Sequence, residues 1–421
     1  GDNLMKINIK KTSLAYLTIL AVIMHGAVYW SVYAQESYAV LGLVAVTELL
    51  ILTFVAHSGI QKWFLVYCVV SASCYFMAAF VNGIGLSAGL NIKTALIYDL
   101  NILTILVGFA IDKKKFINYF VWLITVISAI SLFFYAVQSF LGKEAISSFF
   151  TYVEWGRGHY VNLFYSFPLK DTRNYAVFYE PGVFQILTNS ALYILIFGKN
   201  YFELSNKKYI ISILILCAAI LTSGSTTGYI NLLLILSGII FTKGKTTLQK
   251  RISMLFFVAV IIVLIDYVIN GMNSILSTYV LNKIFETQSS SGVTNYNTSG
   301  GARLYMFSLM LSALKQNPLF GIGGDAVNNA ISTKFFEGFG TGNGLASLVA
   351  GKGLLTAFAI IGPFIYMGYK NRGIRFHYLI LLMIYFNTVC AQSPYSIMCC
   401  SFVLLFVMKF NERMDIGSEV S

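Results

Sequence analysis

Apolar stretches recur along the whole chain, and short polar segments separate most of them. Many of these stretches hold roughly 17 to 25 residues, which is the length that a helix needs to cross a bilayer. We therefore predict an all-α polytopic integral membrane protein, with residues 1–421 as one membrane domain and about twelve transmembrane helices. The spans are expected near residues 14–34, 38–57, 63–82, 94–111, 117–140, 179–198, 209–223, 226–242, 252–270, 343–369, 376–391 and 395–409.

The polar connections predict how the chain is oriented. Lysine and arginine gather in alternate connections, such as DKKK at 112–115 and TKGKTTLQKR at 242–251. By the positive-inside rule these connections and both termini face the cytoplasm. The net charge of +12 therefore reflects residues that anchor spans. A nucleic-acid partner is not expected, because the basic residues are not gathered with aromatic residues on one face.

Composition supports the membrane interpretation and narrows the chemistry. Hydrophobic residues make up 57% of the chain and charged residues 11%, which is far more apolar than soluble domains are. All six cysteines fall inside predicted spans. Neither a disulfide in a loop nor a Cys/His zinc site is therefore expected, and we predict no metal site.

Two outer connections are long, one near residues 141–178 and the other near residues 271–342. Loops of this length are usually functional or disordered. The first is rich in aromatic residues (FFTYVEWGRGHYVNLFYSF, 149–167), which is typical of a segment that lies in the membrane interface. The second contains RLYMFSLMLSALKQ, which ends at Asn317-Pro318 and is too short to span. We predict an interfacial or re-entrant helix there, and we expect both long loops to contain interfacial helices.

Three arginines lie in these two outer loops, against the preference of positive charge for the cytoplasm: Arg157, Arg173 and Arg303. A guanidinium group matches phosphate oxygens in a bidentate way that a lysine ammonium group cannot reproduce. This pattern indicates a phosphorylated or diphosphate-bearing ligand at the outer membrane surface. The alternative is that these arginines anchor helix ends at lipid headgroups, and it applies most readily to Arg157 among its aromatic neighbours.

Glu180 follows Arg173 by seven residues and directly precedes Pro181. Proline is common in the first turn of a helix, so we expect a span to begin here, with Glu180 at its positive dipole end. Glu180 is either a base at the mouth of the span or a helix-start carboxylate paired with Arg173. Burial would raise its pKa and Arg173 would lower it, so the sequence leaves its charge open.

Four segments, taken in order, resemble the O-antigen polymerase and ligase superfamily of bacterial envelope glycosyltransferases, most closely the Wzy-type polymerases. They are RNYAVFYEPGVFQ (173–185), LTSGSTTGYINLLL (221–234), ARLYMFSLMLSALKQNPLFGIGGD (302–325) and GNGLASLVAGKGLL (342–355). Ligases of this superfamily carry a histidine shortly before the asparagine that corresponds to Asn343. Residues 271–342 contain no histidine, which favours a polymerase over a ligase.

The resemblance implies a GT-C-like fold and a place in the bacterial inner membrane, with the active site facing the periplasm. The implied reaction moves a growing chain en bloc from undecaprenyl diphosphate to the non-reducing end of a new lipid-linked repeat unit, as in O-antigen and lipopolysaccharide biosynthesis. No cofactor and no metal are implied. The implied partners are the lipid-linked oligosaccharides, membrane lipids and a chain-length-regulating co-polymerase.

The outer-loop arginines and the family resemblance together indicate the candidate site residues. Arg173 and Arg303 are expected to contact the diphosphate, with Arg157 and Lys170 as weaker helpers. Glu180 is the first candidate for the general base, and Asp325 is the second unless it only stabilises its own turn. The residues expected to bind substrate also include His159, Tyr179, Ser225 and Asn343. The alternatives are that His159 is an interfacial residue, that Tyr179 belongs to an aromatic belt and that Ser225 only stabilises its turn.

Two other functions stay open. A ligase would deliver finished polysaccharide to lipid A core, and the acceptor would distinguish it from a polymerase. A transporter or flippase of lipid-linked saccharides is the alternative from another class, because charged residues inside spans often mark ion routes. Besides Glu180 at the mouth of its span, the acidic residues inside predicted spans are Glu48, Asp99 and Asp266, and only Glu48 is expected near mid-depth.

Overall fold

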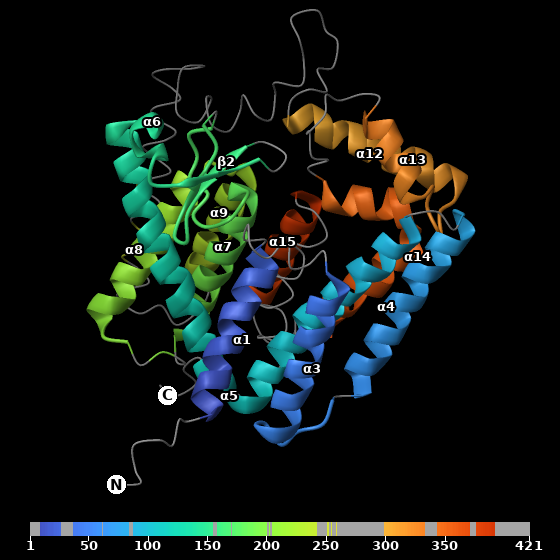
Figure 1. The fold of residues 1–421 in the computed structure, drawn as a ribbon, viewed down its shortest axis with the longest axis horizontal. Coiled ribbons are helices and arrows are strands. Elements are labelled where there is room, and N and C mark those ends of the chain that lie inside the picture. The colour runs from blue at the N-terminus through green and yellow to red at the C-terminus, as the bar shows by residue number, and fades with distance from the viewer. Residues whose placement is uncertain are drawn as a thin grey trace, which may run out of the picture. The chain divides into compact units, whose positions relative to one another are not determined.

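The computed structural model describes residues 9–26, 37–60, 62–83, 87–154, 158–169, 171–199, 202, 204–241, 251, 254, 258, 299–332, 343–370 and 376–391 (Figure 1). The chain divides into two compact units. Unit 1 comprises Gly1–Phe76 and Gly85–Ser225, and unit 2 comprises Met77–Ile84 and Thr226–Ser421. Each unit is built mainly of helices, and α4 (Lys62–Val81) begins in the first and ends in the second.

Apart from α6, the helices of unit 1 overlap the predicted spans. They are α1 (Ile9–Gly26), α3 (Tyr38–Phe54), α5 (Ser87–Leu141), α6 (Lys143–Ser147), α7 (Pro181–Phe197) and α8 (Asn206–Thr222). Helix α5 covers two predicted spans, and its backbone leaves helical geometry at Asp112 between them (φ −163°, ψ 97°). The Asp112 carboxylate accepts a hydrogen bond from the amide of Lys115 at 3.0 Å, so the polar DKKK segment starts a new helical segment.

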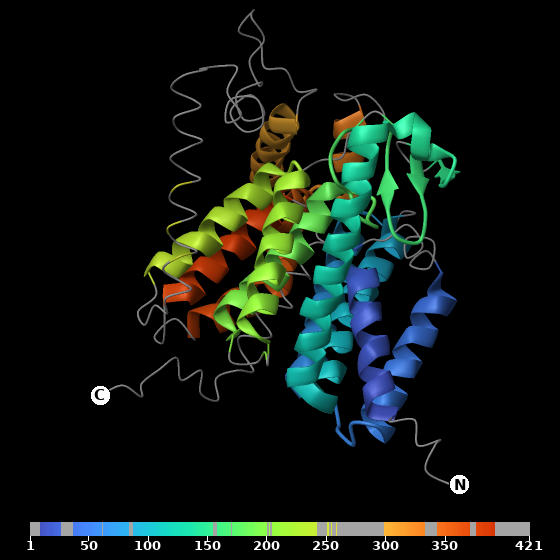
Figure 2. The same ribbon diagram turned by 90° about the vertical axis from the view of Figure 1, so that its left-hand side faces the viewer.

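A small antiparallel sheet occupies the first long outer connection. Its strands are β1 (Thr151–Val153), β2 (His159–Val161) and β3 (Ser166–Phe167), in the order β1-β2-β3. Tyr152 faces Tyr160 across one pair, and Tyr160 faces Phe167 across the next. Figure 2 shows the strands at the end of α5 that carries α6.

Interfacial helices are expected in both long loops; in this one the described aromatic stretch forms strands, and α6 is the described helix. Aromatic and β-branched side chains favour strands because they pack well across a pleated surface. Buried Ile146, Tyr165 and Phe167 form the core beneath this sheet, and Phe134 stacks on the ring of Tyr165 at 5.4 Å. Strand pairing and this aromatic core together explain why the segment folds as a hairpin with a third strand.

Unit 2 contains α9 (Thr226–Phe241), α12 (Ser299–Gln316), α13 (Gly324–Ser332), α14 (Gly344–Lys370) and α15 (Phe376–Ala391). Helices α9 and α15 are joined by buried polar groups. The Asn231 amide donates to the Thr388 hydroxyl at 3.1 Å and accepts from the Asn387 amide at 2.7 Å. Polar side chains between apolar helices are satisfied in this way, which stabilises their pairing in a membrane.

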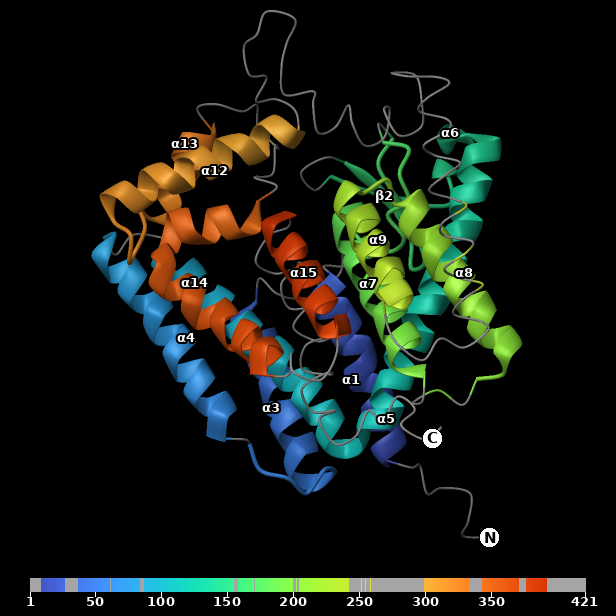
Figure 3. The same ribbon diagram turned by 180° about the vertical axis from the view of Figure 1, so that it is seen from behind.

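Helix α14 is broken at Gly353, where φ is 76° (Figure 3). The helix changes direction there, and the turn that connects α12 to α13 lies against the break. An apolar core joins α12, α13 and the first part of α14, and it comprises Met306, Ala313, Val327, Ala346 and Ala350. The predicted helix after Arg303 is thus present as α12, with α13 as a further short helix.

Length and composition support a membrane protein. The segments Lys62–Val81, Ala95–Leu141 and Gly344–Pro363 are long and apolar enough to cross a bilayer. Shorter apolar helices are Tyr38–Phe54, Pro181–Phe197, Thr226–Ile239 and Leu379–Ala391. The predicted spans 252–270 and 395–409 fall almost wholly outside the described residues.

Candidate functional site in unit 1

Two of the sequence motifs meet in unit 1. The backbone amide of Asn174 donates to the carbonyl of Thr222 at 3.0 Å, which joins the segment before α7 to the last turn of α8. The Asn174 side-chain amide also donates to the hydroxyls of Ser131 and Thr222, both at 3.1 Å. Asn174 is fully buried. Because a buried amide gains stability only when it is hydrogen-bonded, Asn174 holds RNYAVFYEPG in one place against α5 and α8.

The same asparagine shapes the turn that follows it. Its side-chain oxygen accepts from the amide of Ala176 at 3.0 Å, and Ala176 has a positive φ of 51°. A non-glycine residue in this region is disfavoured and persists only when neighbouring contacts hold it. Ser166 of β3 supplies further contacts, since its amide donates to Ala176 and its hydroxyl to the carbonyl of Phe178. The turn is therefore tied to the sheet as well as to the helices.

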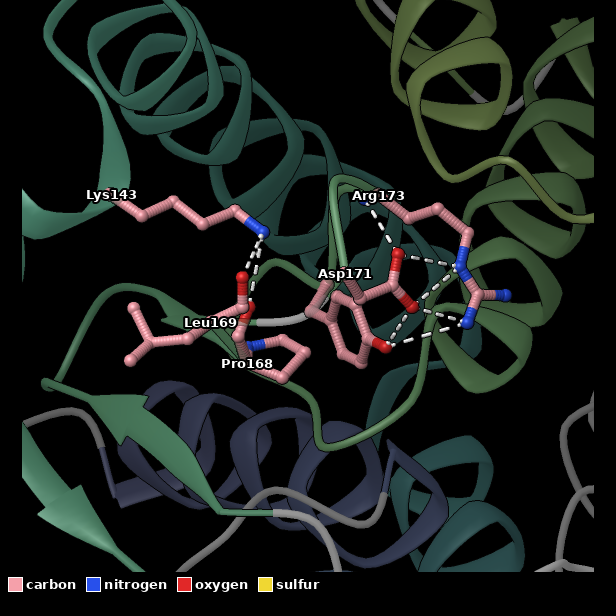
Figure 4. Close-up of polar contacts among 6 residues, drawn as sticks. Lys143, Pro168, Leu169, Asp171 and Arg173 are labelled. Atoms are coloured by element: carbon pink, nitrogen blue, oxygen red, sulfur yellow. Dashed lines mark hydrogen bonds and ion pairs between the residues drawn. The ribbon is translucent and has the colours of Figure 1, made fainter.

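Arg173 lies next to this anchored asparagine, and its guanidinium group is oriented by Asp171 (Figure 4). Nε donates to both carboxylate oxygens of Asp171, at 3.0 and 2.8 Å, and Nη2 donates to Oδ2. The Tyr175 hydroxyl donates to the same Oδ2. In Figure 4 the Nη1 nitrogen points away from the carboxylate, and among the described residues it forms no hydrogen bond. One edge of the fork is thus occupied by Asp171, and the other is available.

The Arg173 stem passes over the turn between α8 and α9. A Cβ atom added at Gly224 would lie 2.7 Å from Cγ and 2.8 Å from Cδ of Arg173. Gly224 also has a positive φ of 60°, which side-chain-bearing residues rarely adopt. Gly224 of the SGSTTG motif therefore makes room for Arg173 of the RNYAVFYEPG motif.

The electrostatics of the pair favour the charged forms of both groups. Burial by itself raises the pKa of Asp171, but the hydrogen bonds and charge of Arg173, together with the Tyr175 hydroxyl, hold it well below the usual carboxyl range. Burial acts against the Arg173 cation, yet the hydrogen bond to Asp171 and the contacts with Tyr175 raise the pKa of Arg173 above its usual value. Both groups are therefore charged at neutral pH.

Lys143 supports the loop that carries Asp171. Its Nζ donates to the carbonyls of Pro168 and Leu169, at 3.1 and 3.2 Å (Figure 4). Burial lowers the pKa of Lys143, and the carboxylates of Asp171 and Glu144 act in the opposite direction. A cation from α6 thereby fixes the backbone two to three residues before Asp171.

Glu180 is the N-cap residue of α7, with extended backbone geometry, and Pro181 follows as the first helical residue. The expected helix start is confirmed. The Glu180 side chain does not cap the helix by a hydrogen bond. Arg173 forms an ion pair with Asp171, a partner that was not predicted. A half-buried carboxylate thus lies at a helix N-terminus, where the dipole favours its negative charge.

The other residues expected in unit 1 take different places. His159 is buried on β2, with its ring edge-to-face to Tyr175 at 5.5 Å between ring centroids. Ser225 is buried directly before α9, and Tyr179 is half-buried beside Glu180. Arg157 and Lys170 lie outside the described residues.

Three residues that organise this site were not among the predicted site residues: Lys143, Asp171 and Asn174. The signal for Asp171 was available, because an aspartate two residues before an arginine can reach its guanidinium within one turn of chain. For Asn174 and Lys143 no local signal exists, since their partners lie 25 to 48 residues away in the sequence.

Unit 2 holds the remaining candidates. Arg303 is half-buried on α12, and Asp325 is exposed in the first turn of α13. The Asn343 side-chain oxygen accepts from the amide of Ala346 at 3.0 Å, so Asn343 caps α14. Groups of three or more His, Cys, Asp or Glu side chains that could hold a metal ion do not occur within the described residues.

Comparison with known families gives one match. A family model described as O-antigen ligase matches residues 211–345, which include most of α8, the SGSTTG turn, α9, α12 and α13. No curated protein matches the chain. The family match supports the O-antigen polymerase and ligase superfamily and does not distinguish polymerase from ligase. Arg303 and Asp325 lie inside the matched segment, whereas Asp171 and Arg173 precede it.

Proposed function

We propose that this protein is a Wzy-type polymerase, which joins undecaprenyl-diphosphate-linked oligosaccharide repeat units into O-antigen or a related surface polysaccharide. The observation that carries the proposal is the geometry of Arg173. Asp171 orients its guanidinium group through one edge and leaves Nη1 available to an anionic ligand. The match of residues 211–345 to the O-antigen ligase family supports the same class of lipid-linked substrate.

In this proposal a hydroxyl group at the non-reducing end of the incoming repeat unit attacks the anomeric carbon of the growing chain. The bond between that carbon and the diphosphate oxygen breaks, and undecaprenyl diphosphate leaves with the electron pair. The hydroxyl proton passes to a carboxylate, with Glu180 as first candidate and Asp325 as second. Arg173 stabilises the charge that develops on the leaving diphosphate, and Arg303 is proposed as a further diphosphate ligand.

An oriented guanidinium suits this task because it needs no rearrangement when charge develops. The carboxylate of Asp171 brings the net charge of the pair to zero. The same carboxylate holds the Arg173 side chain in one orientation. The fork retains directional donors on its free edge, which point charges such as lysine lack. The reaction is accordingly proposed to proceed without a metal ion.

The topology belongs to the same proposal. Twelve spans in a GT-C-like arrangement would place both termini in the cytoplasm and the Arg173 site in the periplasm, at the outer surface of the inner membrane. The carrier lipid, the donor and the acceptor would then meet at one membrane face. A chain-length-regulating co-polymerase is proposed as a partner in that membrane.

The second candidate function is an O-antigen ligase, which is how the matching family model is described, although the match does not distinguish a ligase from a polymerase. A ligase would use the same diphosphate donor but a different acceptor, lipid A core. The absence of a histidine from residues 271–342 of the sequence favours the polymerase. Nothing in the family match supports a transporter.

The test uses the purified protein in lipid nanodiscs with an undecaprenyl-diphosphate repeat unit from its own host. We expect a ladder of longer lipid-linked chains on gels, and we expect Arg173→Ala to lose it. Transfer that occurs only after lipid A core is added would establish a ligase. Movement of the lipid across vesicle membranes with no new glycosidic bond would overturn both enzyme proposals.

A further inference from the structure

We propose that Lys352, at the break in α14, is a binding residue for the phosphate groups of a lipid-linked diphosphate. This inference rests on the proposed function and adds a residue to it. Lys352 lies in the segment GNGLASLVAGKGLL (342–355), but the resemblance assigns no role to it. The backbone around the break, the charges of unit 2 and the apolar surface beyond the break support this role.

The break in α14 is held rigidly by the turn that follows α12. The amide of Ile322 donates to the carbonyl of Ala350 at 2.8 Å. On the other side of the break, the amides of Leu354 and Leu355 donate to Pro318 and Leu319, at 2.9 and 3.2 Å. The backbone groups that the break frees are thereby satisfied, which is a condition for irregular backbone inside a membrane. We call this arrangement, residues 318–322 against 350–355, the α14 clasp.

Two further contacts complete the α14 clasp. The Asn82 amide donates to the carbonyl of Phe320 at 2.9 Å, and the Thr356 hydroxyl donates to the carbonyl of Lys352 at 3.0 Å. A Cβ atom at Gly353 would lie 2.1 Å from the carbonyl oxygen of Leu319, so the two backbones are in direct contact. The α14 clasp therefore fixes the backbone of Lys352, which immediately precedes the break.

The charges around the α14 clasp are unbalanced toward the positive. The described residues of α12, α13 and Gly344–Pro363 include Arg303, Lys315 and Lys352 but only one carboxylate, that of Asp325. Gly324 packs against Gly351: a Cβ atom added at Gly351 would lie 3.8 Å from the Cα of Gly324. Asp325, the next residue, is close enough to act electrostatically on Lys352. Asp325 is exposed in the first turn of α13, where the helix dipole already favours its charge.

Lys352 lies near the middle of the apolar segment Gly344–Pro363 and is half-buried. Lysine in such a position is costly, and ionisable residues inside spans commonly mark substrate pathways. Beyond the break, α14 exposes the apolar side chains of Phe358 and Ile365. A ligand with a phosphate head and a hydrocarbon tail matches a lysine on a fixed backbone followed by an exposed apolar helix face. Lysine ammonium groups bind phosphates as point charges.

The experiment measures binding of radiolabelled undecaprenyl diphosphate to the full chain in phosphatidylcholine nanodiscs. We expect Lys352→Met to weaken binding at least about tenfold, because a charge-assisted contact to phosphate is lost. Lys352→Arg should keep most of the affinity. Lys315→Met is the matched control, since Lys315 is an exposed lysine on α12, and it should bind like the wild type.

Asp325→Asn separates ligand binding from simple pairing. If Lys352 binds phosphate, removing the only described carboxylate nearby should leave the affinity unchanged or raise it. Equal weakening by Lys352→Met and Asp325→Asn would show that the two residues only join α13 to α14, and the proposal would fall. Thermal unfolding of each variant shows whether Lys352→Met is folded. If it is not, Lys352→Gln takes its place, and wild-type affinity in that variant overturns the proposal.

Two further measurements identify the ligand and distinguish a failure of the Lys352 proposal from a failure of the proposed polymerase function. Full competition by phosphatidylglycerol would assign the site to an ordinary phospholipid headgroup and overturn the proposed ligand. Binding in the wild type that persists in Lys352→Met refutes the role of Lys352 alone. Failure of the wild type to bind undecaprenyl diphosphate at all, with no ladder formed, would instead refute the proposed polymerase function.

Discussion

The cationic groups of the two units are held in place by different means. In unit 1, Arg173 is oriented by side chains, through Asp171, Tyr175 and the buried Asn174 beside it. In unit 2, Lys352 is placed by backbone, through the α14 clasp. Side-chain orientation can be altered one group at a time, whereas a backbone clasp fails as a whole. The comparison therefore predicts graded losses in unit 1 and an abrupt loss in unit 2.

The largest expected effect is that of Gly353→Ala. The added methyl group would meet the backbone of Leu319 at 2.1 Å, and the positive φ of 76° disfavours any side chain. We expect unit 2 to lose about 3 kcal/mol or more of stability, measured as a loss of monodisperse protein on size-exclusion chromatography and a lower Tm. Gly362→Ala is the matched control on the same helix, because nothing lies within 4 Å of its added Cβ. Equal behaviour of the two variants would contradict the α14 clasp.

The next effect is that of Arg173→Ala on polymerisation. We expect kcat to fall about 10² to 10³-fold, by analogy with the loss of one oxyanion donor. Arg173→Lys should recover little, because an ammonium group cannot both engage the Asp171 carboxylate along one edge and present a second edge. Ladder formation by the purified variants measures this. Full recovery by lysine would show that only the positive charge matters.

A smaller effect is expected for Asp171→Asn. The guanidinium would lose its ion pair and its single orientation, so we expect kcat to fall about tenfold with the protein still folded. Because the pKa of Asp171 lies below its usual range in the folded protein, the pair stabilises the fold above the ordinary carboxyl pKa. That contribution is lost as the pH falls through the folded pKa.

The pH dependence of Tm provides the control for Asp171. Near neutral pH the free energy of unfolding of the wild type should exceed that of Asp171→Asn by about 1 kcal/mol, a value reduced by the partial exposure of both side chains. The difference should shrink in acid. A difference that stays constant with pH would show that the carboxylate charge contributes nothing.

The smallest effect is expected for substitution of Asn343, which lies in unit 2. Asn343→Ala removes the cap of α14 and should cost about 1 kcal/mol of stability. Asn343→Ser and Asn343→Asp restore a capping oxygen and should recover the Tm. If both substitutions recover Tm but not ladder formation, Asn343 also contacts substrate; if activity follows Tm, it acts as a cap alone.

Much of the helical framework was predictable from the sequence. Helices α3, α4, α7, α9 and α15 begin and end within a few residues of the predicted spans, because continuous apolar runs and flanking polar residues determine where a membrane helix can lie. The interruption of α5 at Asp112 was also predicted, from the DKKK segment. Pro181 marked the start of α7 for a local reason, its fixed φ and missing amide hydrogen.

By contrast, the small sheet in the first outer connection was not predicted. Its strands are two or three residues long and their aromatic content equally suits a membrane interface, so only pairing between segments distinguishes the two.

For the site, the sequence by itself determined the chemistry: an arginine and a glutamate at the start of an apolar helix, glycine-rich turns and a second arginine on α12. Tertiary structure decided which of these groups meet. It paired Arg173 with Asp171 and placed the stem of Arg173 over Gly224. It also placed Lys352 at a break that Pro318 and Leu319 complete from another segment. These contacts depend on backbone hydrogen bonds and close approaches between residues far apart in the chain, and local residue preferences carry no record of such distant partners.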